Sequence, residues 1–161
     1  MTIPLPLDRA GIEQILPHRE PFLLIDEVLE LDPGERVLAR KRVRADEWYL
    51  RGHFPGRPVM PGVLIVEAMA QTGAVAVLAE EENRGRIALF AGIDDTRFKR
   101  IVEPGDELEL ECTLEQVRGP VGRGRARATV NGELAARGTL TFAVERKEGA
   151  RGGTTSSPMT S

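Results

Sequence analysis

Residues Val63 to Ala79 read VLIVEAMAQTGAVAVLA, and this stretch decides the fold. It is apolar on every side apart from a few polar positions such as Glu67 and Gln71, so we expect a helix that is buried all round. The helical pattern continues to Glu82. Pro61 suits the first helical turn, because its missing N–H would have no partner there anyway. Such a helix needs other elements wrapped around it.

The sequence after the helix has the period of strands. Ile87 to Ile93 is a short apolar run, and Glu107 to Leu114 alternates apolar residues with glutamates. Arg123 to Val130 alternates polar and small residues, and Asn131-Gly132 behind it is a typical hairpin turn. Glu133 to Val144 continues as the next strand. Period two with one charged face indicates half-exposed antiparallel strands.

The elements before the helix are shorter. Leu7 to Leu16 is predicted as a short helix that Asp8 caps and Pro17 closes. Pro21 to Leu31 begins as an apolar run and then alternates, and Arg36 to Val43 is predicted as a strand with its basic residues outward. Together the elements predict one α+β domain, in which a curved antiparallel sheet wraps a long central helix.

Composition limits the kind of protein. The chain has 161 residues, of which 41% are hydrophobic, and that suffices for one domain. We place this domain at residues 1–146 and expect 147–161, rich in Gly, Ser and Thr, to be a disordered tail. A net charge of -3 argues against a general nucleic-acid binder.

Other features of the sequence bear on its location. No stretch combines the length and apolarity of a membrane span, and the N-terminus lacks the pattern of a secretory signal. The single cysteine, Cys112, cannot form an internal disulfide, which favours a reducing compartment. We therefore expect a cytoplasmic protein without nucleic-acid or membrane partners.

The central helix carries a carboxylate that its surroundings make costly. A charged Glu67 on such a helix must be paired, protonated or facing a cavity. Burial would raise its pKa, and a carboxyl group that stays protonated near neutral pH is what a general acid needs. A purely structural pairing, for example with Gln71 one turn later, stays an alternative at this point.

The loop before the helix carries a histidine. His53 lies in GHFPG, and the loop ends where the first N–H groups of the helix, near Gly62 and Val63, are free donors at the positive end of the helix dipole. A base, an oxyanion donor and an acid together suit removal of water from a 3-hydroxyacyl thioester. In that reaction His53 would be the base, Gly62 N–H the donor and Glu67 the acid. Taken on its own, a loop histidine such as His53 would suit a surface or capping role better, and the neighbouring Glu67 favours the catalytic interpretation.

Other catalytic groupings are weaker. The sequence has neither a Gly-x-Ser-x-Gly elbow nor a glycine-rich phosphate loop, and its two histidines lie far apart, which argues against zinc. Cys112 lies on the apolar face of a strand and is expected to pack in the core. We expect neither a metal nor a cofactor.

Three segments resemble the (3R)-hydroxyacyl-[acyl-carrier-protein] dehydratases of the FabZ type. They are GHFPGRPVMPGVLIVEAMAQ (52–71), LPHREPFLLID (16–26) and FAGIDDTRFKRIVEPGDELEL (90–110). The resemblance implies a hot-dog fold and a homodimer, assembled further as a trimer of dimers. It also implies an active site at the dimer interface, with the positions of His53 and Glu67 contributed by different subunits and a backbone donor at Gly62.

The resemblance also implies the reaction and its partner. The chain would convert (3R)-hydroxyacyl-ACP to trans-2-enoyl-ACP in fatty acid biosynthesis, with acyl carrier protein (ACP) delivering the substrate. Arg97, Lys99 and Arg100 are candidate contacts for this acidic partner, and a stripe from Arg123 to Arg127 is a second candidate. His18, in the LPHR segment, is expected to be structural, because it has no carboxylate companion in a comparable setting. A hot-dog thioesterase and a non-catalytic acyl-binding or assembly module remain alternatives.

Overall fold

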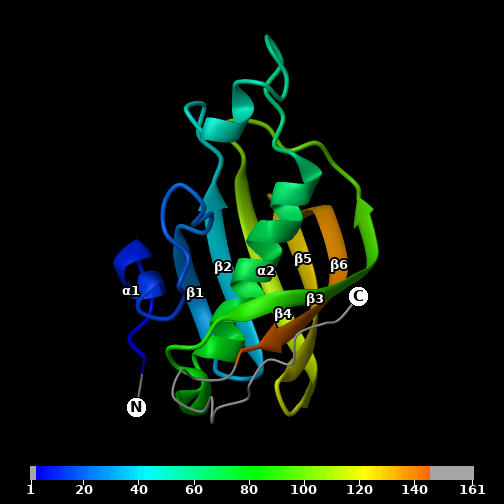
Figure 1. Cartoon of the computed structure of the whole chain (residues 1–161). Helices are drawn as coiled ribbons and strands as arrows, with labels where there is room; N and C mark the ends of the chain where they lie inside the picture. The colour runs from blue at the N-terminus through cyan, green and yellow to red at the C-terminus, as the bar shows by residue number, and fades with distance from the viewer. Residues whose placement is uncertain (1–2, 146–161) are drawn as a thin grey trace, which may run out of the picture.

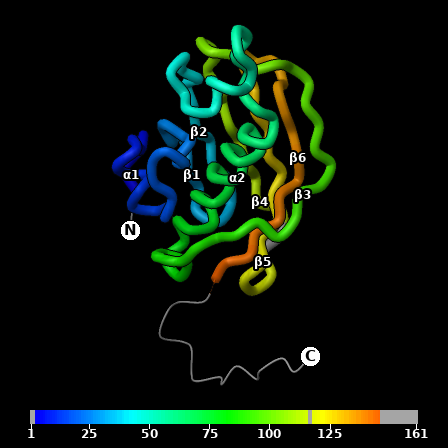
Figure 2. The backbone as a smooth tube through the Cα atoms, turned by 45° about the horizontal axis from the view of Figure 1, so that its top comes forward, coloured from blue at the N-terminus to red at the C-terminus, as the bar shows by residue number. Residues whose placement is uncertain are grey.

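The computed structural model describes residues 3–145, in which one long helix lies against one curved sheet (Figure 1). The strands are β1 (Glu27–Asp32), β2 (Arg36–Arg42), β3 (Ala88–Phe98), β4 (Glu107–Arg118), β5 (Val121–Val130) and β6 (Glu133–Val144). Their order is β1-β2-β4-β5-β6-β3, and every neighbouring pair is antiparallel. The helix α2 (Gly62–Leu78) crosses one face of the sheet in both views (Figure 2). The predicted hot-dog architecture is confirmed, whereas the predicted C-terminal tail lies outside the described residues.

The long helix packs very closely on the sheet. Its side chains are buried almost continuously from Ile65 to Leu78. At Gly73 an added Cβ would lie 2.8 Å from the ring of Phe142 and 2.9 Å from the sulfur of Cys112, so only a residue without a side chain fits there. The first turn is less buried than predicted, since Val63 is 75% exposed.

The helix also ends earlier than its apolar pattern predicts. The amide of Asn83 donates to the carbonyl of Val77, and the guanidinium of Arg84 donates to the carbonyl of Ala79. These polar groups satisfy carbonyls that the last turn leaves free. A short 3-10 helix, η2 (Glu81–Asn83), follows in place of the predicted last turn.

The smaller elements largely match the prediction. A short helix, α1 (Arg9–Glu13), begins where the carboxylate of Asp8 accepts the N–H of Gly11 at 2.9 Å. Asn131 and Gly132 both have positive φ, 49° and 81°, as a tight hairpin between β5 and β6 requires. The prediction that all basic residues of β2 face outward is wrong for one of them. Lys41 is 1% exposed, and its ammonium lies 3.0 Å from the carboxylate of Glu47.

The two edges of the sheet differ. Strand β1 is partly covered, because Leu7 bridges to Val28 and α1 packs beside it (Figure 1). Strand β3 pairs only with β6 in the described part of the chain, although it is long and apolar. Leu89, Phe90 and Ile93 are 49%, 40% and 50% exposed. An uncovered edge with this character can pair with another chain.

Candidate functional site

The carboxyl group of Glu67 lies in a small polar cluster on α2. Its Oε1 accepts a hydrogen bond of 3.1 Å from the amide nitrogen of Gln71, and the ring Nε2 of His18 lies 3.8 Å from the same oxygen. The Glu67 side chain is 18% exposed. Burial raises its pKa, and the hydrogen bond from Gln71 opposes this only in part. The site therefore favours a neutral carboxyl group at a higher pH than water does.

Gln71 ties this cluster to the N-terminal segment. Its side chain is 1% exposed. Its carbonyl oxygen accepts the N–H of Leu24 at 2.8 Å, and its amide nitrogen also donates to the carbonyl of Phe22 at 2.8 Å. With both backbone partners in place, the amide can face in one direction only, and its second N–H is directed at Glu67.

The position of His18 corrects the reason given for its structural role. The sequence suggested no carboxylate companion, but Glu67 lies beside it. The two residues also line a common cavity of about 30 Å³ with Gln71, whose remaining wall is apolar and includes Phe90 and Phe142. Burial, and then the positive charge of Arg19, lower the pKa of His18. No local pattern could have shown this pairing, because the two residues lie in separate segments of the sequence.

His53 is oriented by its own loop. Its Nδ1 lies 2.7 Å from the carbonyl oxygen of Val59, and the N–H of Val59 donates to the carbonyl of His53 at 2.8 Å. Because a carbonyl can only accept, Nδ1 must carry the hydrogen. In the neutral ring the lone pair is therefore on Nε2, which is the arrangement that a general base requires.

The start of α2 offers backbone donors. The N–H groups of Leu64 and Ile65 donate to the carbonyl of Pro61, whereas those of Gly62 and Val63 have no acceptor among residues 3–145. Pro61 provides no side-chain cap. An added Cβ at Gly62 would lie 2.8 Å from the ring of Phe98, so this glycine lets the ring lie directly against the helix start.

A largely apolar groove of about 580 Å³ runs beside these donors, and its lining includes Gly62, Val63 and Phe98. Two of the predicted carrier-protein contacts, Lys99 and Arg100, also line it. Arg100 is already paired with Asp106 and Glu133. Lys99 and Arg97 are exposed and have no ion pair in the described part of the chain, so they are the freer cations.

Within one chain the two halves of the predicted acid/base pair stay apart. Within residues 3–145, Glu67 lies within 4.0 Å of a nitrogen of His18, whereas no carboxylate lies that close to a nitrogen of His53. Glu67 lies five positions after Gly62, which places it about 7.5 Å further along the helix and about 140° around its axis. The structure thus separates the predicted acid from the predicted base within one chain. The loop of His53, which leads to the helix start at Gly62, is called the His53 half-site below, and the cluster around Glu67 is called the Glu67 half-site.

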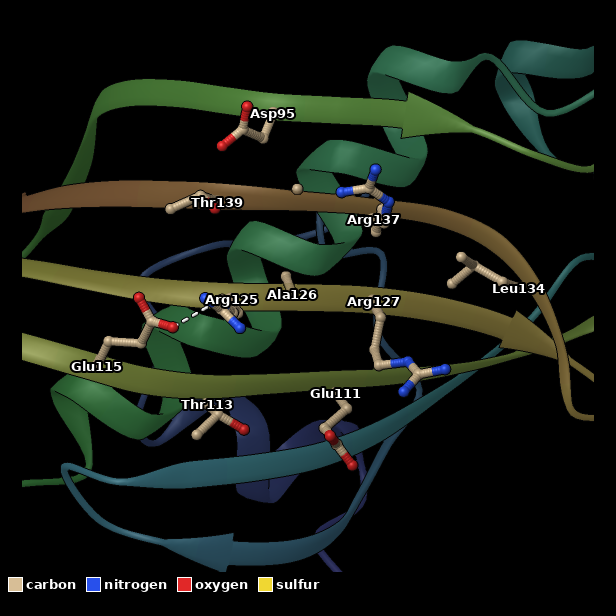
Figure 3. Close-up of a pocket in the computed structure, with 11 residues that line it drawn as sticks. Asp95, Glu111, Thr113, Glu115, Arg125, Ala126, Arg127, Leu134, Arg137 and Thr139 are labelled. Atoms are coloured by element: carbon tan, nitrogen blue, oxygen red, sulfur yellow. Dashed lines mark ion pairs between the residues drawn. The ribbon is translucent and has the colours of Figure 1, made fainter.

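A larger hollow, of about 770 Å³, lies on the opposite face of the sheet and contains none of the candidate catalytic residues (Figure 3). Charged side chains of both signs line it, and Arg125 pairs with Glu115 across it. Such mixed charge is typical of a solvated strand face. This finding weakens the Arg123–Arg127 stripe as a contact for an acidic partner.

Three further observations on residues 3–145 concern the cysteine, metal-binding groups and membrane-spanning helices. Cys112 is fully buried, and burial raises the pKa of its thiol to about 12, which agrees with a packing role. That part of the chain contains no group of three or more His, Cys, Asp or Glu side chains arranged to hold a metal ion. It also contains no helix with the length and apolarity needed to cross a membrane.

Comparison with known proteins places the chain among proteins of one family. Residues 16–139 match the family described as FabA-like domain. A protein of Bacillus cereus (strain AH187), named 3-hydroxyacyl-[acyl-carrier-protein] dehydratase FabZ, is 58% identical over 142 residues, which cover 88% of this chain and 99% of that protein. A protein of the same name from Bacillus thuringiensis (strain Al Hakam) has the same identity and coverage.

Solved structures share the fold at lower identity. The dehydratase heterocomplex ApeI:P from Xenorhabdus doucetiae has a TM-score of 0.73 at 20% identity, covering 84% of this chain and 91% of that one. A mutant of the phenylacetic acid degradation protein PaaI from Thermus thermophilus has a TM-score of 0.56 at 22% identity, covering 75% and 93%. Similarity at this level concerns the arrangement of the helix and sheet.

Proposed function

The chain belongs to the FabA-like domain family, as a member of its FabZ-type dehydratases, and we propose that it converts (3R)-hydroxyacyl-ACP to trans-2-enoyl-ACP with His53 as base and Glu67 as acid. The observation that carries this proposal is the chemical state of these two side chains. One presents a free lone pair on Nε2, and the other is a carboxyl group whose pKa is raised by burial. Elimination of water requires this combination.

The steps follow from the chemistry of each group. Nε2 of His53 takes the proton next to the thioester carbonyl, and the free N–H groups of Gly62 and Val63 stabilise the charge that develops on the carbonyl oxygen. Glu67 gives its proton to the departing hydroxyl, which leaves as water. The groove beside Gly62 has room for the reacting end of the acyl group, whereas the cavity at Glu67 is about the size of one water molecule.

A homodimer would complete the site. In an isologous dimer each copy offers the same surface to the other, so the His53 half-site of one subunit can face the Glu67 half-site of its partner. The uncovered β3 edge supports this arrangement, because Phe90 both lies on that edge and forms part of the wall beside Glu67. The proposal makes the dimer the smallest active unit, and trimers of dimers would repeat it.

Acyl carrier protein is the proposed partner that brings the substrate. Lys99 lines the groove at the helix start, and Arg97 lies near it in the sequence. Both cations are exposed, which suits an acidic protein that binds transiently. Replacing both with glutamate is expected to raise KM for a carrier-linked substrate while leaving the KM for a small thioester analogue unchanged.

The assembly can be tested by mixing two inactive variants. His53→Ala and Glu67→Gln should each lower kcat by about 10²–10⁴-fold. When the two are unfolded and refolded together, half of the dimers are hybrids with one intact site, so about a quarter of wild-type activity should return. Activity is followed as conjugated enoyl thioester formed from a 3-hydroxyacyl thioester.

The results of this mixing experiment distinguish the proposed dehydratase from the alternative functions. No recovery in the mixture, with both single variants inactive, would place the pair within one chain and refute the shared site. Release of free thiol without enoyl product would instead identify a thioesterase. Substrate binding without any product would identify an acyl-binding module.

A further inference from the structure

We propose that His18 is a positioning residue for this dehydration: with Gln71 it holds Oε1 of Glu67 as the accepting oxygen, and so keeps the acidic proton on Oε2. The inference rests on the proposed function, since it concerns how the acid is presented. It assigns a role to the histidine of the N-terminal segment, which the acid/base pair itself does not use.

Two side chains approach one oxygen, and one of them already donates a hydrogen bond to it. The Gln71 amide nitrogen lies 3.1 Å from Oε1, and its orientation is determined by Leu24 and Phe22. The ring Nε2 of His18 lies 3.8 Å from the same atom, close enough for a small movement to form a hydrogen bond. In a neutral carboxyl group one oxygen accepts and the other carries the proton, so donors at Oε1 direct the proton to Oε2.

The tautomer of His18 agrees with this role. Its Nδ1 is buried and has no hydrogen-bond partner in residues 3–145. A hydrogen on that atom would be an unsatisfied buried donor, whereas a hydrogen on Nε2 would lie on the side of the ring that faces the Glu67 carboxyl, 3.8 Å away. The proton is therefore expected on Nε2.

The surroundings of His18 favour the neutral imidazole over the protonated one. Burial lowers the pKa of His18, and the charge of the adjacent Arg19 lowers it further. The cavity walls contributed by β3 and β6 are Ala88, Phe90 and Phe142, which carry no charge. In the proposed dimer His53 of the partner subunit is the further titratable group at this site. Among residues 3–145 of one chain, His18 is the basic residue whose side chain lies within 4.0 Å of the Glu67 carboxyl group.

Hydrogen-bond donors at Oε1 help Glu67 to release its proton during the reaction. The O–H bond at Oε2 breaks, its proton joins the substrate hydroxyl, and the hydroxyl leaves as water with the electron pair of the C–O bond. The proton from the carbon next to the thioester goes to His53, and its electron pair forms the new double bond. Glu67 is left as a carboxylate, which hydrogen-bond donors stabilise more than they stabilise the neutral acid. His18 and Gln71 thus make Glu67 a better acid, and release of the proton from His53 and uptake of one by Glu67 restore the enzyme.

Two variants of equal polarity test the idea on the full-length protein. His18→Gln places an amide N–H close to the position of Nε2, whereas the shorter side chain in His18→Asn does not reach it. The asparagine variant should lose about tenfold or more in kcat, because the acid is misplaced. Its KM should stay within about twofold of wild type, because the acyl groove is untouched. The glutamine variant should recover most of kcat, while the two variants melt at similar temperatures.

The pH profile gives a second readout. Because the active form of Glu67 is protonated, kcat falls as pH rises through its pKa. Without the second donor that pKa rises, so the alkaline limb of kcat in His18→Asn should move up by about one pH unit. Equal kcat values in His18→Gln and His18→Asn, whether both high or both low, would overturn the role of His18. Full activity in Glu67→Gln would instead overturn the proposed function, and this inference with it.

Discussion

Replacing Gln71 with leucine is expected to destabilise the protein by about 2–6 kcal/mol, because it leaves one buried and one partly buried backbone group without partners. The two groups are the N–H of Leu24 and the carbonyl of Phe22, each bonded to the Gln71 amide at 2.8 Å. Leucine has nearly the same volume, so packing changes little. Each orphaned group costs about 1–3 kcal/mol, which is a large share of a typical total stability of about 5–15 kcal/mol.

The neighbouring residue provides the matched control. Thr72 is as fully buried as Gln71, but its hydroxyl bonds to the carbonyl of Ala68 within the helix. That carbonyl keeps its helical N–H partner when Thr72→Val removes the hydroxyl. The control should therefore change stability by about 1 kcal/mol or less.

Urea unfolding at neutral pH and one fixed protein concentration measures both variants. With a slope of about 2 kcal/mol per molar urea, Gln71→Leu should lower the midpoint by about 1–3 M. The single tryptophan, Trp48, donates to the carbonyl of Pro21 at 3.0 Å, so its fluorescence reports on the segment that Gln71 holds. If Gln71→Leu unfolds at the same urea concentration as Thr72→Val, the reasoning about orphaned backbone groups is refuted.

Three further outcomes are expected. Gly73→Ala should lose about 1–3 kcal/mol in urea unfolding, because its Cβ would meet Phe142 and Cys112 below 3.0 Å; an unchanged midpoint would mean that the helix can shift without cost. Above pH 4.5, Glu67→Gln should unfold at a higher urea concentration than wild type. Burial raises the pKa of Glu67 in the folded state, so the wild-type protein loses stability as pH rises from the unfolded-state pKa to the folded-state pKa, and the difference between the two proteins grows over that range. A difference in urea midpoint that does not depend on pH would contradict this. Native Cys112 should resist alkylation at pH 8 and react only after unfolding, because burial raises its pKa to about 12 and closes access; labelling by mass spectrometry at the native rate of an exposed thiol would disprove it.

The spacing of apolar residues predicted those helices and strands whose buried side follows from their own sequence. The apolar stretch predicted α2, and the alternating runs predicted β4, β5 and β6, with Glu133–Val144 matching in both bounds. It also identified Glu67 as a carboxyl group in an unfavourable place, and burial does raise its pKa. These features are local, because the spacing of apolar residues determines which side of an element is buried.

Contacts between distant segments were beyond such reasoning. Nothing near His18 in the sequence indicates that it contacts Glu67. Lys41 was expected in solvent, and its pairing with Glu47 could not be predicted because it depends on how the chain turns after β2. The exposure of β3 was missed for a different reason. An apolar run such as LFAGI predicts burial but does not say whether the covering surface belongs to the same chain.

Strand β3 contacts both the cavity at Glu67 and the start of α2, and the irregularities in its pairing with β6 matter for both contacts. Phe90 near its start lines the cavity at Glu67, and Phe98 at its end lies against Gly62. The register of β3 against β6 shifts twice between the two rings, at Phe90–Gly92 and at Asp94–Arg97, so the strand does not alternate regularly there. The side on which each ring lies therefore depends on where these irregularities stand, and a change that removed one of them would turn one ring away from its contact even with the length of β3 unchanged.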